Sequence, residues 1–341
     1  MVVVRPAQLD DVETMYQLAL EAGHGLTTLP ANRERLTQKV LHSQASFDKS
    51  VQAAGDEYYL FVLENDDGEV IGTSALEAAV GLKQPFYTYK VGTIVHSSHT
   101  LGVHNQVETL FLGNDYTGAT ELCTLFLSPR YRKGHNGRLL SKARFLFLAQ
   151  FPERFANLVI AEMRGYSDEQ GRSPFWEALG RHFFSMSFAE ADRLSGLGSN
   201  QFIAELMPKH PIYTCLLPEE ARQVIGQVHP HTRPALKLLQ SDGFRYRKYV
   251  DIFDAGPTIE CETDKITTVR ESRTGVVTEI ENQNSELGVM HLISNTRLAG
   301  FRAVVAPLLG TQEEGYIISE RVAERLNINK GDTIRVAPYR R

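Results

Sequence analysis

Hydrophobic and polar positions in the first half of the chain follow strand and helix patterns in alternation. Short apolar or β-branched runs predict strands at 2–5, 58–64, 70–76, 91–96 and 157–163. Apolar residues at helical spacing predict helices after Asp10 and Asp11, around 33–43 and over 173–180. This pattern indicates a mixed α/β or α+β architecture in which helices flank a sheet.

The strongest strand pattern in the chain is Thr120 to Leu127. Its run is largely apolar, which is typical of a central strand covered on both faces. A basic segment that contains two glycines, 131–137, follows the strand. A helix is predicted directly after this segment, because Leu139, Leu140 and Ala143 lie in helical register.

The pattern partly recurs after about residue 190. Helices are predicted at 219–225 and 234–243, followed by a strand at 249–254. From about residue 260 the chain changes to short β-runs at 266–269, 275–280, 291–294 and 301–305. A closing helix at 321–326 leads to a last strand at 332–336. We therefore predict three units, at 1–190, 191–258 and 259–341.

The composition excludes several classes of protein. The 341 residues are 42% hydrophobic and 23% charged with a formal charge of −5, so no basic surplus predicts a nucleic-acid partner. No run approaches the roughly 20 apolar residues of a membrane helix. The three cysteines are far apart and form no CxxC pair, and the histidines have no matching carboxylates, so we predict neither disulfides nor a metal site. These features favour a cytoplasmic protein.

The segment between the strand at 120–127 and the next helix has the chemistry of an anion site. A helix N-terminus presents unpaired N–H groups and a partial positive charge, and glycines let a ligand approach the backbone. The residues predicted to bind are Arg132, Lys133, Gly134, His135, Asn136, Gly137 and Arg138. This combination suits a pyrophosphate, although a basic surface turn is the alternative. A Walker A loop is excluded, because no Gly-Lys-Ser/Thr follows.

The segment Tyr131 to Leu140 resembles the acyl-CoA motif of GNAT acyltransferases, Q/R-x-x-G-x-G/A leading into a helix. With Gly134 as the first glycine, Tyr131 stands at the Q/R position and Asn136 at the second small position. Longer segments of the chain resemble arginine N-succinyltransferases. They are 25–30, 72–81, 125–132, 164–166, 173–176 and 249–257.

This resemblance extends over nearly the whole chain and implies a fold and a reaction. The fold would be a GNAT-like mixed twisted sheet flanked by helices. Residues 1–190 would bind acyl-CoA, 191–258 would be a second GNAT-like half that completes the active-site cleft, and 259–341 would be a small β-rich subdomain. The reaction would transfer succinyl from succinyl-CoA to the α-amino group of L-arginine, giving N2-succinylarginine and CoA. It would be the first step of arginine degradation by the succinyltransferase pathway.

The resemblance also implies where the co-substrate lies. Coenzyme A would run along the strand that ends at Leu127, so Leu125, Phe126 and Leu127 are expected to contact succinyl-CoA. Succinyl-CoA is then a co-substrate, and no cofactor is expected to be bound permanently.

His229 is the candidate proton donor. An imidazole titrates near neutral pH, and Pro230 restricts His229 to an extended conformation on a loop before a helix. The resemblance assigns this position the proton-donor role, while spacing alone does not separate it from His231. Cys123 lies in the middle of an apolar strand, where a thiol is usually inert. Direct attack of the amine on the thioester is therefore preferred to a cysteine intermediate.

The charges of arginine and succinyl-CoA require partners of opposite sign. Glu77, Glu121 and Glu162 lie on or beside predicted strands and could face the site, and Arg5 and Arg164 could bind a carboxylate. Each of these side chains is more often part of a structural ion pair, so none is predicted as a site residue.

Three alternatives stay open on the sequence. The acyl donor could be another acyl-CoA, the amine could be another one such as ornithine, and the chain could be a non-catalytic CoA-binding subunit. L-arginine and succinyl-CoA are the expected partners, with no nucleic acid and no membrane. A homo-oligomer or hetero-oligomer is expected.

Overall fold

The computed structural model describes residues 1–23, 25–196, 201–282 and 288–339. Its strands are β1 (Val3–Pro6), β2 (Tyr58–Glu64), β3 (Val70–Glu77), β4 (Thr88–Ser98), β5 (Val103–Gly113), β6 (Thr120–Leu127), β7 (Leu158–Glu162), β8 (Ile212–Tyr213), β9 (Arg245–Val250), β10 (Pro257–Glu262), β11 (Arg273–Glu281), β12 (Val289–Asn295), β13 (Ala303–Thr311), β14 (Gly315–Ser319) and β15 (Thr333–Pro338). Its helices are α1 (Val12–Ala22), α2 (Arg33–Asp48), α3 (Asn136–Gln150), α4 (Pro174–Ala178), α5 (Gly180–Phe184), α6 (Phe188–Gly196), α7 (Gln201–Leu206), α8 (Glu219–Val224), α9 (Arg233–Ser241), α10 (Thr267–Glu271) and α11 (Glu320–Leu326).

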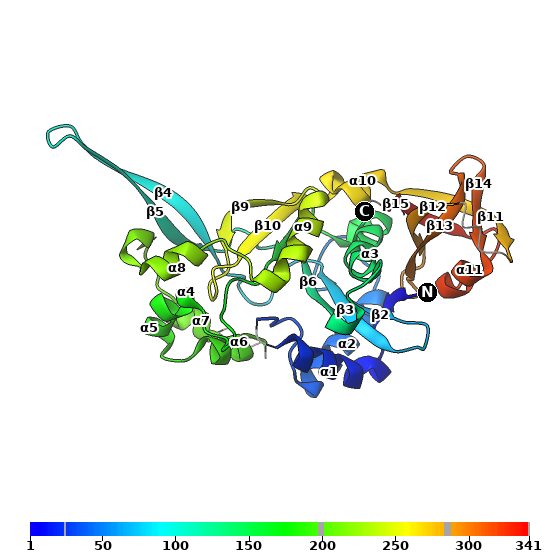
Figure 1. Cartoon of the computed structure of the whole chain (residues 1–341), viewed down its shortest axis with the longest axis horizontal. Helices are drawn as coiled ribbons and strands as arrows, with labels where there is room; N and C mark the ends of the chain where they lie inside the picture. Colours follow the sequence, from blue (N-terminus) through cyan, green and yellow to red (C-terminus); the bar gives the residue numbers. More distant parts are fainter. Residues whose placement is uncertain (24, 197–200, 283–287, 340–341) are drawn as a thin grey trace.

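The strands of the described ranges form one continuous sheet, with both parallel and antiparallel pairs. Its order is β12-β15-β11-β14-β13-β1-β2-β3-β6-β7-β10-β9-β4-β5-β8. Helices α1 and α2 lie on one face of the central strands, and α3 lies on the other (Figure 1). The predicted mixed sheet flanked by helices is therefore confirmed. The division at residues 190 and 258 stays a prediction.

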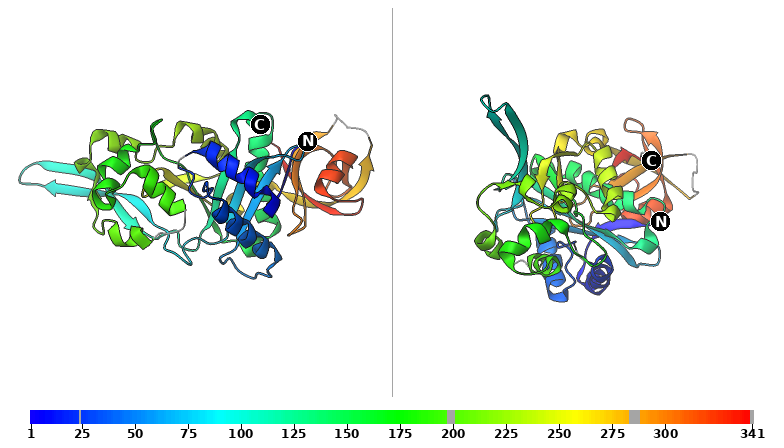
Figure 2. Two further views of the ribbon diagram at one scale, coloured as in Figure 1. Left: turned by 90° about the horizontal axis from the view of Figure 1, so that it is seen from below. Right: turned by 60° about the vertical axis from the view of Figure 1, so that its left-hand side comes forward.

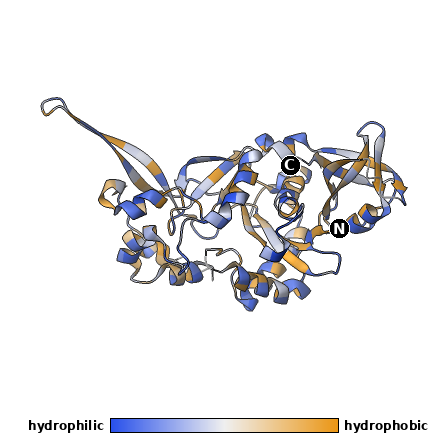
Figure 3. Ribbon diagram, in the orientation of Figure 1, coloured by the Kyte–Doolittle hydropathy of each residue, from blue (hydrophilic) through white to orange (hydrophobic). Residues whose placement is uncertain are grey.

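Side chains of the central strands point alternately to the two faces of the sheet, so a hydrophobic core lies on each face. On β2, Leu60 and Val62 pack with α1 and α2, whereas Tyr59 and Phe61 pack with α3. Phe147 of α3 is fully buried and lies at the centre of a group of aromatic rings. Its ring centroid is 4.9–5.8 Å from those of Phe47, Tyr59, Phe61, Phe151, Phe155 and Phe301. Hydrophobic residues gather on the central strands and on the helix sides that face them (Figure 3).

The five C-terminal strands, β11 to β15, pair with one another in a closed ring. β13 pairs with β12 and β14, β11 pairs with β14 and β15, and β15 pairs with β12. These five strands thus form a small closed barrel with its own core, and α11 packs against it. Closure removes the exposed edges that such short strands would otherwise have. The barrel joins the central sheet through β1, where Val4 pairs with Ala303.

Two strand predictions in the second half are wrong. Residues 266–269 were expected to be a strand, but α10 begins at Thr267. The N–H of Thr267 donates to the carbonyl of Asp242, and the N–H and hydroxyl of Thr268 donate to the Asp242 carboxylate. These bonds anchor a helix start. The strand expected at 249–254 ends at Val250, because the Asp251 carboxylate accepts the N–H groups of residues 253 and 254 and holds a turn.

Residues 88–113 form a long hairpin, and the strand predicted at 91–96 lies within its first strand, β4. Strands β4 and β5 pair along their whole length, and their outer part projects away from the body of the molecule (Figures 1 and 2). The barrel lies at the opposite end of the molecule (Figure 2). Among the described residues, no helix combines the length and hydrophobicity that crossing a membrane requires.

Candidate functional site

The central strands β6 and β7 separate shortly after they meet. They run parallel but pair only at Thr120 with Val159 and at Glu121 with Ile160. Beyond these pairs β6 stays with β3, while β7 stays with β10. The separation leaves a wedge-shaped opening in the middle of the sheet, bordered by the backbone of both strands.

Thr124 marks a bulge in β6 at this opening. Its φ of 56° lies in the left-handed region, and the register against β3 shifts between Thr73 and Ala75. The Thr124 N–H donates to Thr28 Oγ1 at 3.0 Å, and Thr73 Oγ1 donates to the Thr124 carbonyl at 2.9 Å. The bulge turns the following residue, Leu125, toward the opening, where its side chain is half-buried.

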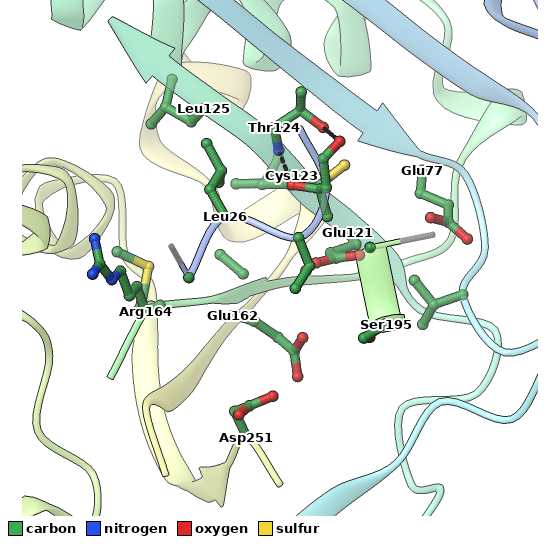
Figure 4. Close-up of a pocket in the computed structure, with 18 of the residues that line it drawn as sticks. Leu26, Glu77, Glu121, Cys123, Thr124, Leu125, Glu162, Arg164, Ser195 and Asp251 are labelled. Carbon is green, nitrogen blue, oxygen red and sulfur yellow. Dashed lines mark hydrogen bonds between the residues drawn. The ribbon is translucent and has the colours of Figure 1, made fainter. Parts of the chain in front are cut away.

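A cavity of about 970 Å³ occupies the opening. Residues from the 25–28 loop, α2, β6, the end of β7 and the turn after β9 line it (Figure 4). Leu125 and Phe126 are among the lining residues, whereas Leu127 is not, and their contact with the co-substrate stays a prediction. Arg132, from the predicted phosphate loop, also lines the cavity.

The predicted phosphate loop joins β6 to α3. Gly134 has a φ of 59°, and the space beside its Cα is open. Within the described chain, the backbone N–H groups of Gly134, His135, Gly137 and Arg138 have no hydrogen-bond acceptor. Several unpaired donors close to a helix start are the arrangement that binds an anion.

The basic side chains of this loop point in different directions. Arg132 Nε donates to the Leu127 carbonyl at 2.9 Å. His135 Nδ1 lies 2.7 Å from the hydroxyl of Tyr339, and Arg138 lies over the Tyr339 ring. A second hollow of about 430 Å³ lies on the other side of the loop. Lys133, Gly134, His135 and Asn136 line it. Of the seven loop residues, Arg132 thus lines the large cavity and Lys133 to Asn136 line the second hollow, whereas Gly137 and Arg138 line neither.

His229 lies beside the end of β7. Its N–H donates to the Arg164 carbonyl at 2.9 Å, next to a bridge between Gly165 and Val228. His229 is half-buried and is not among the residues that line the large cavity, whereas His231 is. The two rings are 4.9 Å apart. The structure therefore brings both histidines to one edge of the opening.

The hydrogen bond between the two histidines identifies the tautomer of His229. The His231 N–H donates to His229 Nδ1 at 3.2 Å, so Nδ1 has no proton and neutral His229 carries its proton on Nε2. Burial, followed by the charges of Arg164 and His231, lowers the pKa of His229 to about 4. The imidazole of the free protein is therefore neutral at pH 7.

Carboxylates gather on one side of the cavity. Glu77, Glu121, Glu162 and Asp251 line it, and Arg164 lies across from them (Figure 4). Burial and then the charge of Glu77 raise the pKa of Glu121 to about 8. Burial and then the charge of Asp251 hold the pKa of Glu162 well above its usual range.

Several side chains considered on the sequence are structural or inert. Arg5 donates to Asp11 at 2.7 Å and to Glu64 at 2.6 Å, away from the cavity. Cys123 is buried, and burial raises the pKa of its thiol to about 12, so at neutral pH it is not a thiolate nucleophile.

Sequence reasoning missed Asp251 and Arg144. The only signal for Asp251 was its place in the string 249–257. Arg144 on α3 is fully buried, lines the cavity and donates to the Cys123 carbonyl at 3.5 Å. Nothing in its helical pattern distinguishes Arg144 from a surface residue.

Comparisons with known proteins agree over the whole length of the chain. Residues 2–268 match the family model "Arginine N-succinyltransferase beta subunit", and residues 273–338 match the model of its C-terminal domain. The arginine N-succinyltransferase subunit beta of Pseudomonas aeruginosa is 49% identical, over 98% of each chain. The arginine N-succinyltransferase of Escherichia coli is 48% identical, over 98% of this chain and 97% of that one. The solved structure of arginine/ornithine succinyltransferase subunit AI from P. aeruginosa has a TM-score of 0.91 at 39% identity. It covers 99% of this chain and 98% of that one.

Reversing the charge of the loop tests the anion site. We expect the double variant Arg132→Glu, Lys133→Glu to bind coenzyme A on the order of 100-fold more weakly, since hydrogen bonds to charged groups each contribute roughly 1.5–3 kcal/mol. Titration calorimetry with coenzyme A measures this change. The matched control is Lys209→Glu, Lys330→Glu, which makes the same charge change at two exposed lysines away from the loop. Equal affinity in the two double variants would contradict the prediction.

Proposed function

The chain belongs to the arginine N-succinyltransferase beta subunit family, and we propose that it transfers succinyl from succinyl-CoA to the α-amino group of L-arginine. The products are N2-succinylarginine and coenzyme A, and the reaction opens the degradation of arginine by the succinyltransferase route. The observation that carries this proposal is 49% identity over 98% of the chain to a curated arginine N-succinyltransferase subunit.

The opening between β6 and β7 supports an acyl-CoA as co-substrate. A pantetheine arm is long and contains amides, so it needs an open strand edge with free backbone groups, and β6 offers such an edge beyond Glu121. The unpaired N–H groups at Gly134, His135, Gly137 and Arg138 would receive the diphosphate. In this proposal Leu125 and Phe126 contact the arm where they line the cavity, and Leu127 continues the strand toward the loop.

The proposed reaction is direct attack of the amine on the thioester. The nitrogen forms a bond to the carbonyl carbon, and the bond between carbon and sulfur breaks. The ammonium must lose one proton before attack and a second as the amide forms, and the departing thiolate takes up one. No covalent enzyme intermediate is needed, in keeping with the high pKa of the Cys123 thiol.

His229 is the proposed proton donor to the thiolate. Its Nε2–H is the free position of the ring, because Nδ1 accepts the His231 N–H. Complete proton transfer requires an imidazolium, in which Nδ1 is also protonated and no longer accepts the His231 N–H. An anionic co-substrate beside the ring favours that form, since an opposite charge raises the pKa of an imidazole. This effect opposes the burial and the Arg164 charge that lower the pKa of His229 in the free protein.

Ornithine is the second candidate amine. The solved relative from P. aeruginosa is described as an arginine/ornithine succinyltransferase. Ornithine carries the same α-amino group and a shorter cationic side chain, so the same chemistry applies to it.

A panel of substrates tests the proposed reaction. Succinyl-CoA, acetyl-CoA and glutaryl-CoA are each offered with arginine and with ornithine, and the products are identified by mass. We expect succinylarginine as the main product, with succinylornithine as the second. Turnover that is faster with acetyl-CoA, or no acylated amino acid with any donor, would reject the proposal.

Replacing His229 tests its role. We expect His229→Ala to lower kcat by roughly 10²–10⁴-fold, the usual contribution of general acid–base catalysis, with little change in the KM for succinyl-CoA. Release of free CoA thiol with succinyl-CoA and arginine measures turnover. His231→Ala is the matched control, because it keeps the backbone N–H that fixes the His229 tautomer. Turnover of His229→Ala equal to that of the wild-type protein would rule out the role.

We also infer that the chain acts in the cytoplasm as part of a homo-oligomer or hetero-oligomer. An isolated two-stranded hairpin is only marginally stable, so the projecting part of β4 and β5 suits a surface covered by another chain. Its exposed apolar residues, Val95, Leu101 and Val103, favour the same interpretation. Light scattering of the purified protein, alone and with candidate partner subunits, measures the mass. A monomer under every condition would overturn this inference.

A further inference from the structure

We propose that the carboxylates of Glu77, Glu121, Glu162 and Asp251 hold the cationic side chain of the amino-acid substrate, while Arg164 across the cavity holds its α-carboxylate. This inference rests on the proposed function and adds to it the residues that orient the amine. The ligand class is an α-amino acid with a long side chain that ends in a guanidinium or ammonium group.

The sheet itself places three of these carboxylates on one face. Glu77 and Glu121 are direct partners across β3 and β6, so their side chains point to the same side. Glu121 is opposite Ile160 on β7, and Glu162 follows two residues later on the same face. Asp251 directly follows β9 and completes the group (Figure 4).

Glu121 is the strongest indication that this group awaits a ligand. It is only 6% exposed, its carboxylate faces the cavity, and no described residue gives it a hydrogen bond or an ion pair (Figure 4). Among the described residues, Glu77 and Glu162 also lack such a partner. A buried carboxylate without a partner is costly, and several beside one another are more so. A bound cation would relieve both costs.

The neighbouring Asp254 differs from Asp251 in that backbone N–H groups bind both of its carboxylate oxygens, whereas the two backbone bonds of Asp251 both go to Oδ1. Its carboxylate accepts the N–H of Gly165 at 2.7 Å and the N–H of Gly256 at 2.8 Å. These bonds fix the turn after β9, which presents Asp251 to the cavity. Asp254 is therefore assigned to the support of the site and is left out of the proposed cation pocket.

Arg164 is one of several cations that line the cavity, with Lys39, Arg132 and Arg144 among the others, and it lies across from the acidic group (Figure 4). Its Nη2 donates to Ser167 Oγ at 3.1 Å, while its buried Nε has no acceptor among the described residues. Gly25 packs directly against this guanidinium, where a Cβ would lie 2.5 Å from Nε, so the side chain is confined. The Nη1 group of this confined guanidinium has no hydrogen bond among the described residues, which suits it to a carboxylate.

The two charged regions orient an amino acid in one direction. With the carboxylate at Arg164 and the side-chain cation among the acidic residues, the α-amino group lies between them, under the β6 bulge at Thr124 and Leu125 (Figure 4). The proposed thioester lies at that same bulge. The α-amino group, rather than the side-chain nitrogen, would then meet the acyl carbon.

Binding of substrate analogues tests the cation pocket without any need for turnover. Citrulline has the shape of arginine but a neutral side chain. We expect the wild-type protein to bind arginine at least about tenfold more tightly than citrulline, and Glu121→Gln and Glu162→Gln each to lose most of this preference. The control Glu153→Gln changes an exposed glutamate outside the cavity and should keep the preference. Titration calorimetry measures each affinity, and unchanged binding of coenzyme A shows that each variant is folded.

Agmatine, which is arginine without its carboxylate, tests Arg164 in the same way. We expect the wild-type protein to prefer arginine over agmatine by about tenfold, and Arg164→Gln to bind the two alike. For the cation pocket, Glu77→Gln on the neighbouring strand provides the same comparison of arginine with citrulline if Glu121→Gln does not fold. Full preference for arginine over citrulline in the folded glutamine variants would overturn the cation pocket.

The outcomes separate this inference from the proposed function. Arginine binding that depends on these carboxylates, in a protein that acylates no amine, would support the pocket and reject the reaction. Succinylation of arginine at an unchanged KM in Glu121→Gln and Glu162→Gln would reject the pocket and leave the reaction standing.

Discussion

The separation of β6 from β7 is the constraint on which the rest of the site depends. Two central strands that pair at only two positions leave backbone groups without sheet partners in the interior of the protein. Side chains from three other elements compensate around the bulge. Thr28, Thr73 and Arg144 hydrogen-bond the backbone of residues 123 and 124. The remaining free strand edge is what a co-substrate with amides along its length requires.

The rigidity of the surroundings maintains this opening against the tendency of strands to pair. α3 begins at the phosphate loop, and the aromatic group around Phe147 packs this helix against the sheet. Lys142 on the same helix forms a buried ion pair of 2.8 Å with Asp242, whose other carboxylate oxygen binds Thr268 at the start of α10. The loop donors and β6 are therefore fixed relative to one another, which preorganises the site.

The sequence predicted those parts of the site that are local along the chain. The apolar run of β6, the glycine loop and the amphipathic start of α3 are each visible within about ten residues, and all three are present. The strand predicted at 91–96 lies within β4, but β5 and the pairing of the two strands were missed, because the exposed outer part of the hairpin has neither a strand nor a helix period. The helix at Thr267 was read as a strand because its start depends on the distant Asp242. The carboxylates of the acidic pocket come from β3, β6, β7 and the end of β9. These segments are far apart in the chain, so no local sequence pattern predicts that their carboxylates meet.

The stability that the protein loses by burying four neighbouring carboxylates indicates that they serve a binding role. Packing stability alone favours apolar residues at positions as buried as Glu121, and neighbouring strand positions of β6 are indeed Leu122 and Cys123. Carboxylates kept together in a poorly solvated space weaken the free protein, as their raised pKa values indicate. Groups that destabilise the fold yet line the same cavity as a confined guanidinium are best explained by what they bind. Here the ligand would have to bring a cation to one side and an anion to the other, as a basic amino acid does.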